Sequence, residues 1–466
     1  MRSSDQKNLA VNMLITNVLL DREDGGFWCL KNRVCIKTRF FFIPHLVHAC
    51  PVLVHFAHRL RNANYAGPVR TLFWLLTFAI LLAAAPTSAK PFLPTDDAQV
   101  LERLPSALSD RSGGEIRGLR QKLTREPDNL ALALQLARLF LEKNRAESDP
   151  RYLGYAHATL SRWWDLDHPP IDALVLRAVI RQSNHEFDDA LSDLALALAA
   201  NPSNAQAWLT RATVLQVRGD YEEAKRSCLP LMRLAPGIAT VTCLSSVASL
   251  NGDAEKSYQL LLDTVARNTD AAPAEKIWAM TLLGEIATRL GRIHEAEARF
   301  RQALALDPVD PYLLAATADF LLDQNRPDEV ISLLRDKTRA DALLLRLAVA
   351  EKRTGARPLK SHVETLRARF ENSRLRGSTV HRREEAMFEL HLLEHPRKAL
   401  DLALANWEVQ KEPADARILL EAALASNQTA EAQPVLVFVE KNRLEDVRLA
   451  KLADQLNASN HLPNVK

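Results

Sequence analysis

The sequence predicts an all-α protein, a solenoid of stacked helix-turn-helix repeats, and two observations support this prediction. The first is a period of 34 residues: Pro202 and Pro236 stand at this spacing, and each closes a segment of the same apolar texture. The second is composition, because glycine is scarce, with 14 in 466 residues, as long helices require. Repeats of this kind cannot bury their apolar faces alone, so several must stack to share a core.

Four segments follow the pattern most closely: residues 171–204, 205–238, 277–310 and 311–342. Two helices approach to about 8–10 Å only where the side chains between them are small. Small residues stand at matching levels of the first and second helices, namely Ala178, Ala212, Gly284, Ala318, Ala190, Ala224 and Ala296. Gly219 and Gly291 suit the turn between the helices, and Pro202, Pro236 and Pro308 end second helices.

This pattern resembles the tetratricopeptide repeat, and the resemblance implies a right-handed superhelical solenoid over residues 115–460. Weaker units are expected at residues 239–270, 343–375, 382–413 and 414–440, where apolar residues keep a helical period. An opening helix pair is expected within residues 115–165 and a final amphipathic helix at residues 444–456. Pro230 falls inside a second helix, so a kink or a shortened helix is expected there.

The residues before the repeats include a segment typical of a secretory signal peptide, at residues 69–89. Arg70 precedes a short apolar run from Leu72 to Ala85, and small residues and Lys90 follow it. A membrane span needs about 20 apolar residues, but retention of residues 72–85 as a membrane anchor stays the alternative. Residues 1–68 are interpreted as a doubtful extension from an over-long gene model, and residues 90–114 as a linker.

The charge balance argues against nucleic acid as a partner. The formal net charge is +3; residues 1–68 hold +5, whereas the residues from Lys90 onward sum to −3. Phosphate backbones are bound by extended basic faces, and no such face emerges from this balance.

The resemblance also implies a binding surface. In tetratricopeptide-repeat proteins the first helices line a concave groove that receives a peptide or a partner segment. At the matching positions of this chain stand Asp172, Val175, Val179, Gln182, Gln206, Leu209, Thr213, Gln216, Trp278, Thr281, Glu285, Thr288, Tyr312, Ala315, Asp319 and Leu322. The lysine and asparagine clamp of the family's chaperone-tail binders is absent. The groove is therefore predicted to take an extended or helical protein segment, with basic residues near Glu285 and Asp319.

Two groups of residues suggest other chemistry. Cys228 and Cys243 are the only cysteines after the signal-like segment, and they stand on either side of Pro236 on antiparallel helices. They are predicted either to form a disulfide in an oxidising compartment or to remain free core residues. An N-terminal stretch holds candidate ligands for zinc or copper, but two prolines interrupt it, and no metal site is predicted: His45, His48, Cys50, His55 and His58.

No phosphate-binding glycine loop, HExxH helix or GxSxG elbow occurs, so neither catalytic residues nor a cofactor are predicted. The leading hypothesis is a periplasmic or secreted protein-interaction scaffold of the bacterial cell envelope. The alternatives are an adaptor anchored in the inner membrane and a regulatory subunit of an enzyme encoded elsewhere.

Overall fold

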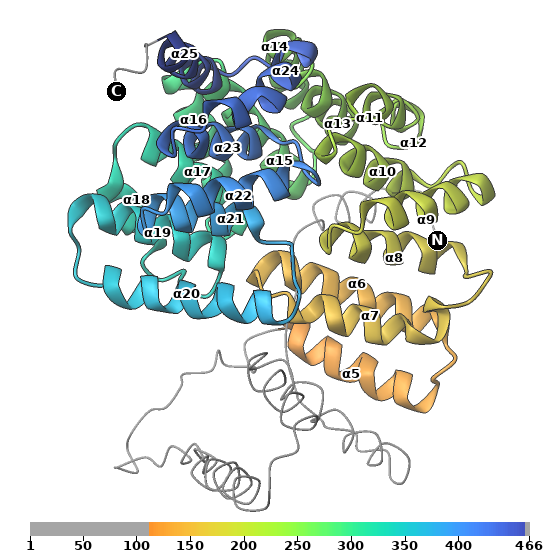
Figure 1. Cartoon of the computed structure of the whole chain (residues 1–466). Helices are drawn as coiled ribbons and strands as arrows, with labels where there is room; N and C mark the ends of the chain where they lie inside the picture. Colours follow the sequence, from red (N-terminus) through yellow and green to blue (C-terminus); the bar gives the residue numbers. More distant parts are fainter. Residues whose placement is uncertain (1–110, 462–466) are drawn as a thin grey trace, which may run out of the picture. The chain divides into compact units, whose positions relative to one another are not determined.

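The computed structural model describes residues 111–461, and all regular elements in this range are helices (Figure 1). The stack opens with α5 (Arg111–Arg125), α6 (Leu130–Glu147) and α7 (Arg151–Trp164). Five helix pairs follow, of which the second has a divided second helix: α8 (Ile171–Ser183) with α9 (Phe187–Ala200), α10 (Ala205–Val217) with α11 (Tyr221–Cys228) and α12 (Leu231–Leu234), α13 (Ile238–Ala248) with α14 (Ala254–Arg267), α15 (Pro273–Arg289) with α16 (Ile293–Leu306), and α17 (Pro311–Asp323) with α18 (Pro327–Leu334).

The remaining helices complete the described chain. They are α19 (Asp341–Thr354), α20 (Leu359–Leu375), α21 (Arg382–Met387), the π-helical turn η1 (Phe388–Leu392), α22 (Pro396–Trp407), α23 (Pro413–Ala425), the 3₁₀ turn η2 (Thr429–Ala432), α24 (Gln433–Asn442) and α25 (Val447–His461). The predicted stack of helix-turn-helix pairs is thus confirmed. Helix α5 begins at Arg111, inside the stretch expected to be a linker.

Close packing within a pair depends on the small residues that the sequence places between its helices. Gly284 of α15 faces the ring of Phe300 on α16, and a Cβ at this position would stand 2.7 Å from the ring. The alanines at the other levels are buried without exception in the four best repeats, for example Ala178 and Ala190. The 34-residue pattern therefore encodes the distance between the two helices of a pair.

Proline 230 divides a second helix, as expected. Helix α11 ends at Cys228, Pro230 is the residue that caps α12, and α12 has only four residues. Because proline has no amide hydrogen and clashes with the preceding turn, α11 cannot continue through it.

The apolar core joins segments that lie far apart in the sequence. Side chains of α10, α11 and α13, among them Leu209 and Tyr221, share one buried cluster with side chains of α21 to α25, among them Trp407, Val435 and Leu449. In a simple solenoid each repeat packs only on its neighbours. Here the C-terminal helices pack back on the second and third of the five helix pairs.

Candidate partner-binding site

The sixteen predicted groove residues do not form one open surface. Asp172 and Tyr312 are exposed, and six are half-buried: Thr213, Gln216, Trp278, Glu285, Ala315 and Asp319. The other eight are buried: Val175, Val179, Gln182, Gln206, Leu209, Thr281, Thr288 and Leu322. In α19 every residue from Leu343 to Glu351 is buried, so that this helix is covered on all sides. A helix lining an open groove would leave one face to solvent.

The connection between α22 and α23 contacts the turns of two helix pairs. The amide nitrogen of Lys411 donates to the carbonyl oxygen of Val217 at 2.7 Å, and the preceding Gln410 donates from Nε2 to Nδ1 of His185 at 3.2 Å. Val217 and His185 lie at the turns of the α10–α11 and α8–α9 pairs. The C-terminal helices thus bind the edge formed by the turns of the middle repeats.

Three turn glycines continue this contact along the stack. Gly219, Gly252 and Gly291 lie in the turns of successive pairs, and their nearest neighbours are Phe438, Arg443 and Val447 respectively. Beside the second glycine, the carboxylate of Glu445 accepts a hydrogen bond of 2.8 Å from the first amide of α14, at Ala254. The segment from α24 to the start of α25 therefore runs along one row of repeat turns.

Ion pairs hold the C-terminal helices to α17. Asp323, at the end of α17, pairs with Arg417 of α23 at 2.7 Å and with Arg448 of α25 at 3.2 Å. One turn earlier on the same helix, Asp319 accepts two hydrogen bonds from Arg346 of α19, at 2.7 and 2.6 Å. Asp319, predicted to meet basic residues of a partner, is satisfied within the chain.

The accessible part of the predicted groove lies around Tyr312 and Glu285, and this region is called the recess. The Tyr312 hydroxyl donates to the Glu285 carboxylate at 2.7 Å. Tyr312 is 52% exposed, yet desolvation raises its pKa, with Glu285 and Glu412 adding to the shift. Both observations fit a side chain that water reaches but that protein surrounds. Burial likewise raises the pKa of Glu285.

A network around Arg383 of α21 lies close to Tyr312, since Arg383 and Glu412 both act on the pKa of Tyr312. Its guanidinium pairs with Glu412 at 2.9 Å and with Asp415 at 3.3 Å. Burial raises the pKa of Asp415 to about 6. Burial alone would raise the pKa of Glu384 as well, but Arg383 and neighbouring cations lower it to about 2. Glu285 and Glu412, both half-buried, are the carboxylates that act on Tyr312, and a basic side chain of a partner would pair with them.

Cys228 and Cys243 form a disulfide between α11 and α13. Their Cα atoms stand 5.9 Å apart and 15 residues apart in sequence. The break at Pro230 leaves the end of α11 level with the middle of α13. Both cysteines are buried in the cluster that the C-terminal helices complete.

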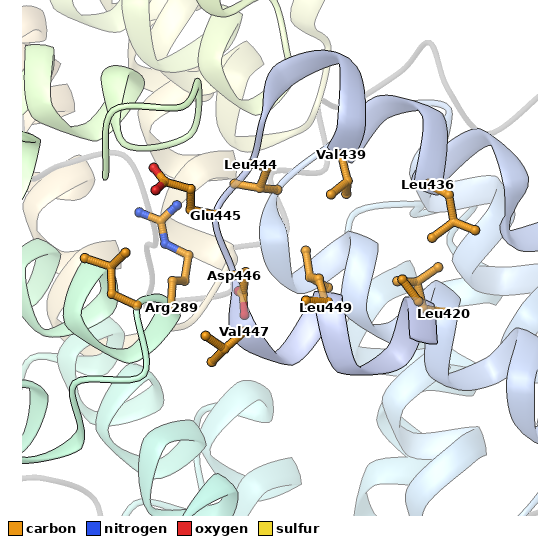
Figure 2. A pocket seen from close by; sticks show the side chains of 12 residues that line it. Arg289, Leu420, Leu436, Val439, Leu444, Glu445, Asp446, Val447 and Leu449 are labelled. Carbon is orange, nitrogen blue, oxygen red and sulfur yellow. The ribbon is translucent and has the colours of Figure 1, made fainter. Parts of the chain in front are cut away.

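A pocket of about 360 Å³ lies between α23, α24, α25 and the end of α15 (Figure 2). Aliphatic side chains such as Leu420, Leu436 and Leu449 line it. Arg289 closes one end, and its guanidinium donates to the carbonyl and hydroxyl oxygens of Ser249 at 3.1 and 2.8 Å. Glu445 and Asp446 also line the pocket, so that it combines apolar walls with charged groups.

Several expectations fall on residues that the structure does not describe. The signal-like segment 69–89, the extension 1–68 and the histidine-rich stretch from His45 to His58 all lie outside residues 111–461. Between Arg111 and His461, no helix has the length and apolar character needed to cross a bilayer. The same residues bring no three metal-binding side chains together.

The sequence interpretation missed two features. One is the cover that α21 to α25 provide, because weak repeats are expected to extend a stack and not to fold back on it. The other is a local excess of basic residues between Arg335 and Arg383, which the balance of the whole chain conceals. A charge count in short windows would have found the second feature.

Comparison with known proteins finds matches among solved structures at low identity and low TM-score. No family model matches the chain. No curated protein matches it either. Among solved structures, yeast Tom70 is 11% identical with a TM-score of 0.35, covering 74% of this chain and 84% of its own. A tetratricopeptide repeat protein from Parabacteroides merdae is 12% identical with a TM-score of 0.33, and the match covers 67% of this chain and 99% of that one. The Cut9–Hcn1 assembly is 13% identical with a TM-score of 0.36, and the match covers 76% of this chain and 91% of that one.

Proposed function

We propose that this stack of tetratricopeptide-type repeats is a protein-interaction scaffold of the bacterial cell envelope, which binds a basic segment of a partner in the recess at Tyr312. The observation that carries the proposal is an accessible aromatic side chain beside two carboxylates. Tyr312 presents half of its surface to solvent and donates to Glu285, while Glu412 adds negative charge beside it.

The recess suits a segment of chain better than a small ligand. An aromatic ring with a hydroxyl provides apolar contact and a hydrogen bond together, and such residues anchor many protein interfaces. The carboxylates around it would pair with lysine or arginine from the visitor. Binding would cover the exposed Tyr312 ring without moving the helices that already cover the rest of the inner face.

Two features support export. The segment from Arg70 to Ala89 has the order of a signal peptide: a positive flank, an apolar run and small residues. The Cys228–Cys243 disulfide suits an oxidising compartment, because disulfides are rare where cellular thiols keep cysteines reduced. A mature chain starting near Lys90 would carry the repeats outside the cytoplasm.

Site-specific photocrosslinking tests the binding site. A photoreactive phenylalanine analogue replaces Tyr312 in the full chain within the native cell, and mass spectrometry identifies what it traps. The matched control places the same analogue at Leu260, which is 54% exposed on the outer helix α14. We expect a defined partner from position 312 and none from position 260. The same crosslinked partners in equal amounts at both positions, or a partner only at position 260, would contradict the recess as the binding site.

Fractionation of the same cells tests the compartment. The proposal expects the protein in the periplasm or medium with an N-terminus near Lys90. Peptides from residues 1–68 in a cytosolic fraction would refute export.

A further inference from the structure

A strong positive charge is concentrated in one part of the described chain. Residues 335–383 contain 14 lysines and arginines against 5 aspartates and glutamates, which gives +9 in a chain of net charge +3. The structure places many of these cations on helix α20 and on the connection before α19. Arg369 of α20 joins the two, because its guanidinium donates to the carbonyl oxygens of Thr338 and Arg339 at 3.2 and 2.9 Å.

Five exposed cations lie on α20 or within two residues of its ends, and together they define the basic surface: Arg357, Lys360, Arg367, Arg374 and Arg376. Within residues 111–461, no carboxylate lies within ion-pair distance of four of them, Arg374 being the exception through Glu385. The exposed acids of α20 are fewer, namely Glu364 and Glu371. Glu364 and Glu371 stand four residues after Lys360 and Arg367 on the same face, so the five cations and two acids leave the exposed residues of this surface a net charge of +3.

An apolar side chain projects from the same surface. Leu375, the last residue of α20, is 79% exposed, more than any other large apolar side chain of the described residues. It stands between Arg374 and Arg376. A leucine flanked by arginines suits the boundary between lipid headgroups and acyl chains, where cations meet phosphates and the apolar group enters.

We propose that the basic surface docks on an anionic phospholipid membrane. A membrane fits these observations better than an acidic protein does. Cations at both ends of a 17-residue helix spread over about 25 Å, which matches a plane of charge better than a pocket. A protein interface would also need an apolar centre, whereas Leu375 stands without apolar neighbours exposed on α20. This contact is separate from the recess at Tyr312 and from any anchor at residues 72–85.

Vesicle co-sedimentation of the full chain tests this proposal. The vesicles are phosphatidylcholine alone or with about one third phosphatidylglycerol, because clustered basic residues bind anionic lipid surfaces. We expect sedimentation with the anionic vesicles that falls as salt is added. Removing two cations in the variant Arg367→Gln/Arg376→Gln should weaken binding roughly thirty-fold. Leu375→Ser should weaken it further at high salt, where only the apolar contact persists.

The matched control is Arg267→Gln/Arg301→Gln, which removes two exposed arginines from α14 and α16. It loses the same net charge elsewhere on the molecule and should bind the anionic vesicles as the unaltered chain does. The apolar run from Leu72 to Ala85 and the basic residues of 1–68, of net charge +5, are the same in every variant, so a difference between the two double variants reports the basic surface alone. Equal losses of anionic-vesicle binding in the two double variants would overturn the proposal.

Discussion

The ring of Phe438 on α24 lies against Gly219, more than two hundred residues earlier, so closely that a Cβ at Gly219 would stand 2.7 Å from it. Gly219 also adopts a φ of +82°, in the left-handed region. Glycine is therefore required at position 219 for two reasons. The turn between α10 and α11 has a left-handed backbone there, and the ring of Phe438 on α24 leaves no room for a Cβ.

Gly219→Ala should lower the free energy of unfolding by about 2–4 kcal/mol, because it adds a clash to a strained backbone. The control is Gly355→Ala, where φ is +70° but a Cβ would meet no atom within 4 Å, so only about 1 kcal/mol should be lost. Denaturant unfolding measures both. In a Phe438→Ala background the cost of Gly219→Ala should fall toward that of Gly355→Ala, leaving only the contact with the Cβ of Lys411 at 3.3 Å. An unchanged cost would show that the contact does not matter.

Asp323→Asn should lower the free energy of unfolding by about 2–3 kcal/mol, since Arg417 and Arg448 lose a carboxylate that is largely buried. Asp263→Asn offers the comparison, because its pair with Arg267 is exposed on one helix and should contribute no more than about 0.5 kcal/mol. Thermal unfolding of both variants tests the difference. Similar losses would mean that the ion pairs of Asp323 do not hold the C-terminal helices.

Reduction of the Cys228–Cys243 disulfide should cost about 3 kcal/mol, the value expected for a loop of 15 residues. Unfolding is followed with and without dithiothreitol. The variant Cys228→Ala/Cys243→Ala should be indifferent to the reductant. If iodoacetamide labels both cysteines in protein that is isolated from the cell and denatured without reductant, the bond is absent.

Stability should fall in mild acid through His185. Burial and the nearby Arg383 lower the pKa of this imidazole to about 4, against an ordinary value of 6.5. The unfolded chain therefore binds a proton first as pH falls. The contribution of His185 is complete above pH 6.5 and should decline by up to about 3 kcal/mol toward pH 4.

His185→Asn provides the test, because asparagine tolerates the left-handed backbone at this position, where φ is +62°. It cannot titrate, so the slope of stability between pH 6.5 and 4 should become shallower. His294→Asn, at an exposed site on α16, should leave the slope unchanged. An identical slope in both variants would exclude His185 as its source.

Much of the local structure could be predicted because it depends on neighbours in sequence. The pairs α8–α9 and α15–α16 follow from small residues at fixed spacing, and the end of α11 follows from Pro230. The position of the candidate site could not be predicted in the same way. Val175 and Leu209 do lie on first helices, as predicted, but their burial depends on packing that the repeat pattern does not specify.

By itself, the sequence determined that helices form, where they turn and which residues lie between the helices of a pair, since these depend on backbone conformation and side-chain size within about 34 residues. Only the tertiary structure decided that α24 and the start of α25 return to the turns at Gly219, Gly252 and Gly291, and that half of the predicted groove residues are buried. The physical reason is that a repeat pattern specifies contacts between neighbours. Contacts across the stack depend on the accumulated angle of many repeats and on single pairs such as Arg417 with Asp323.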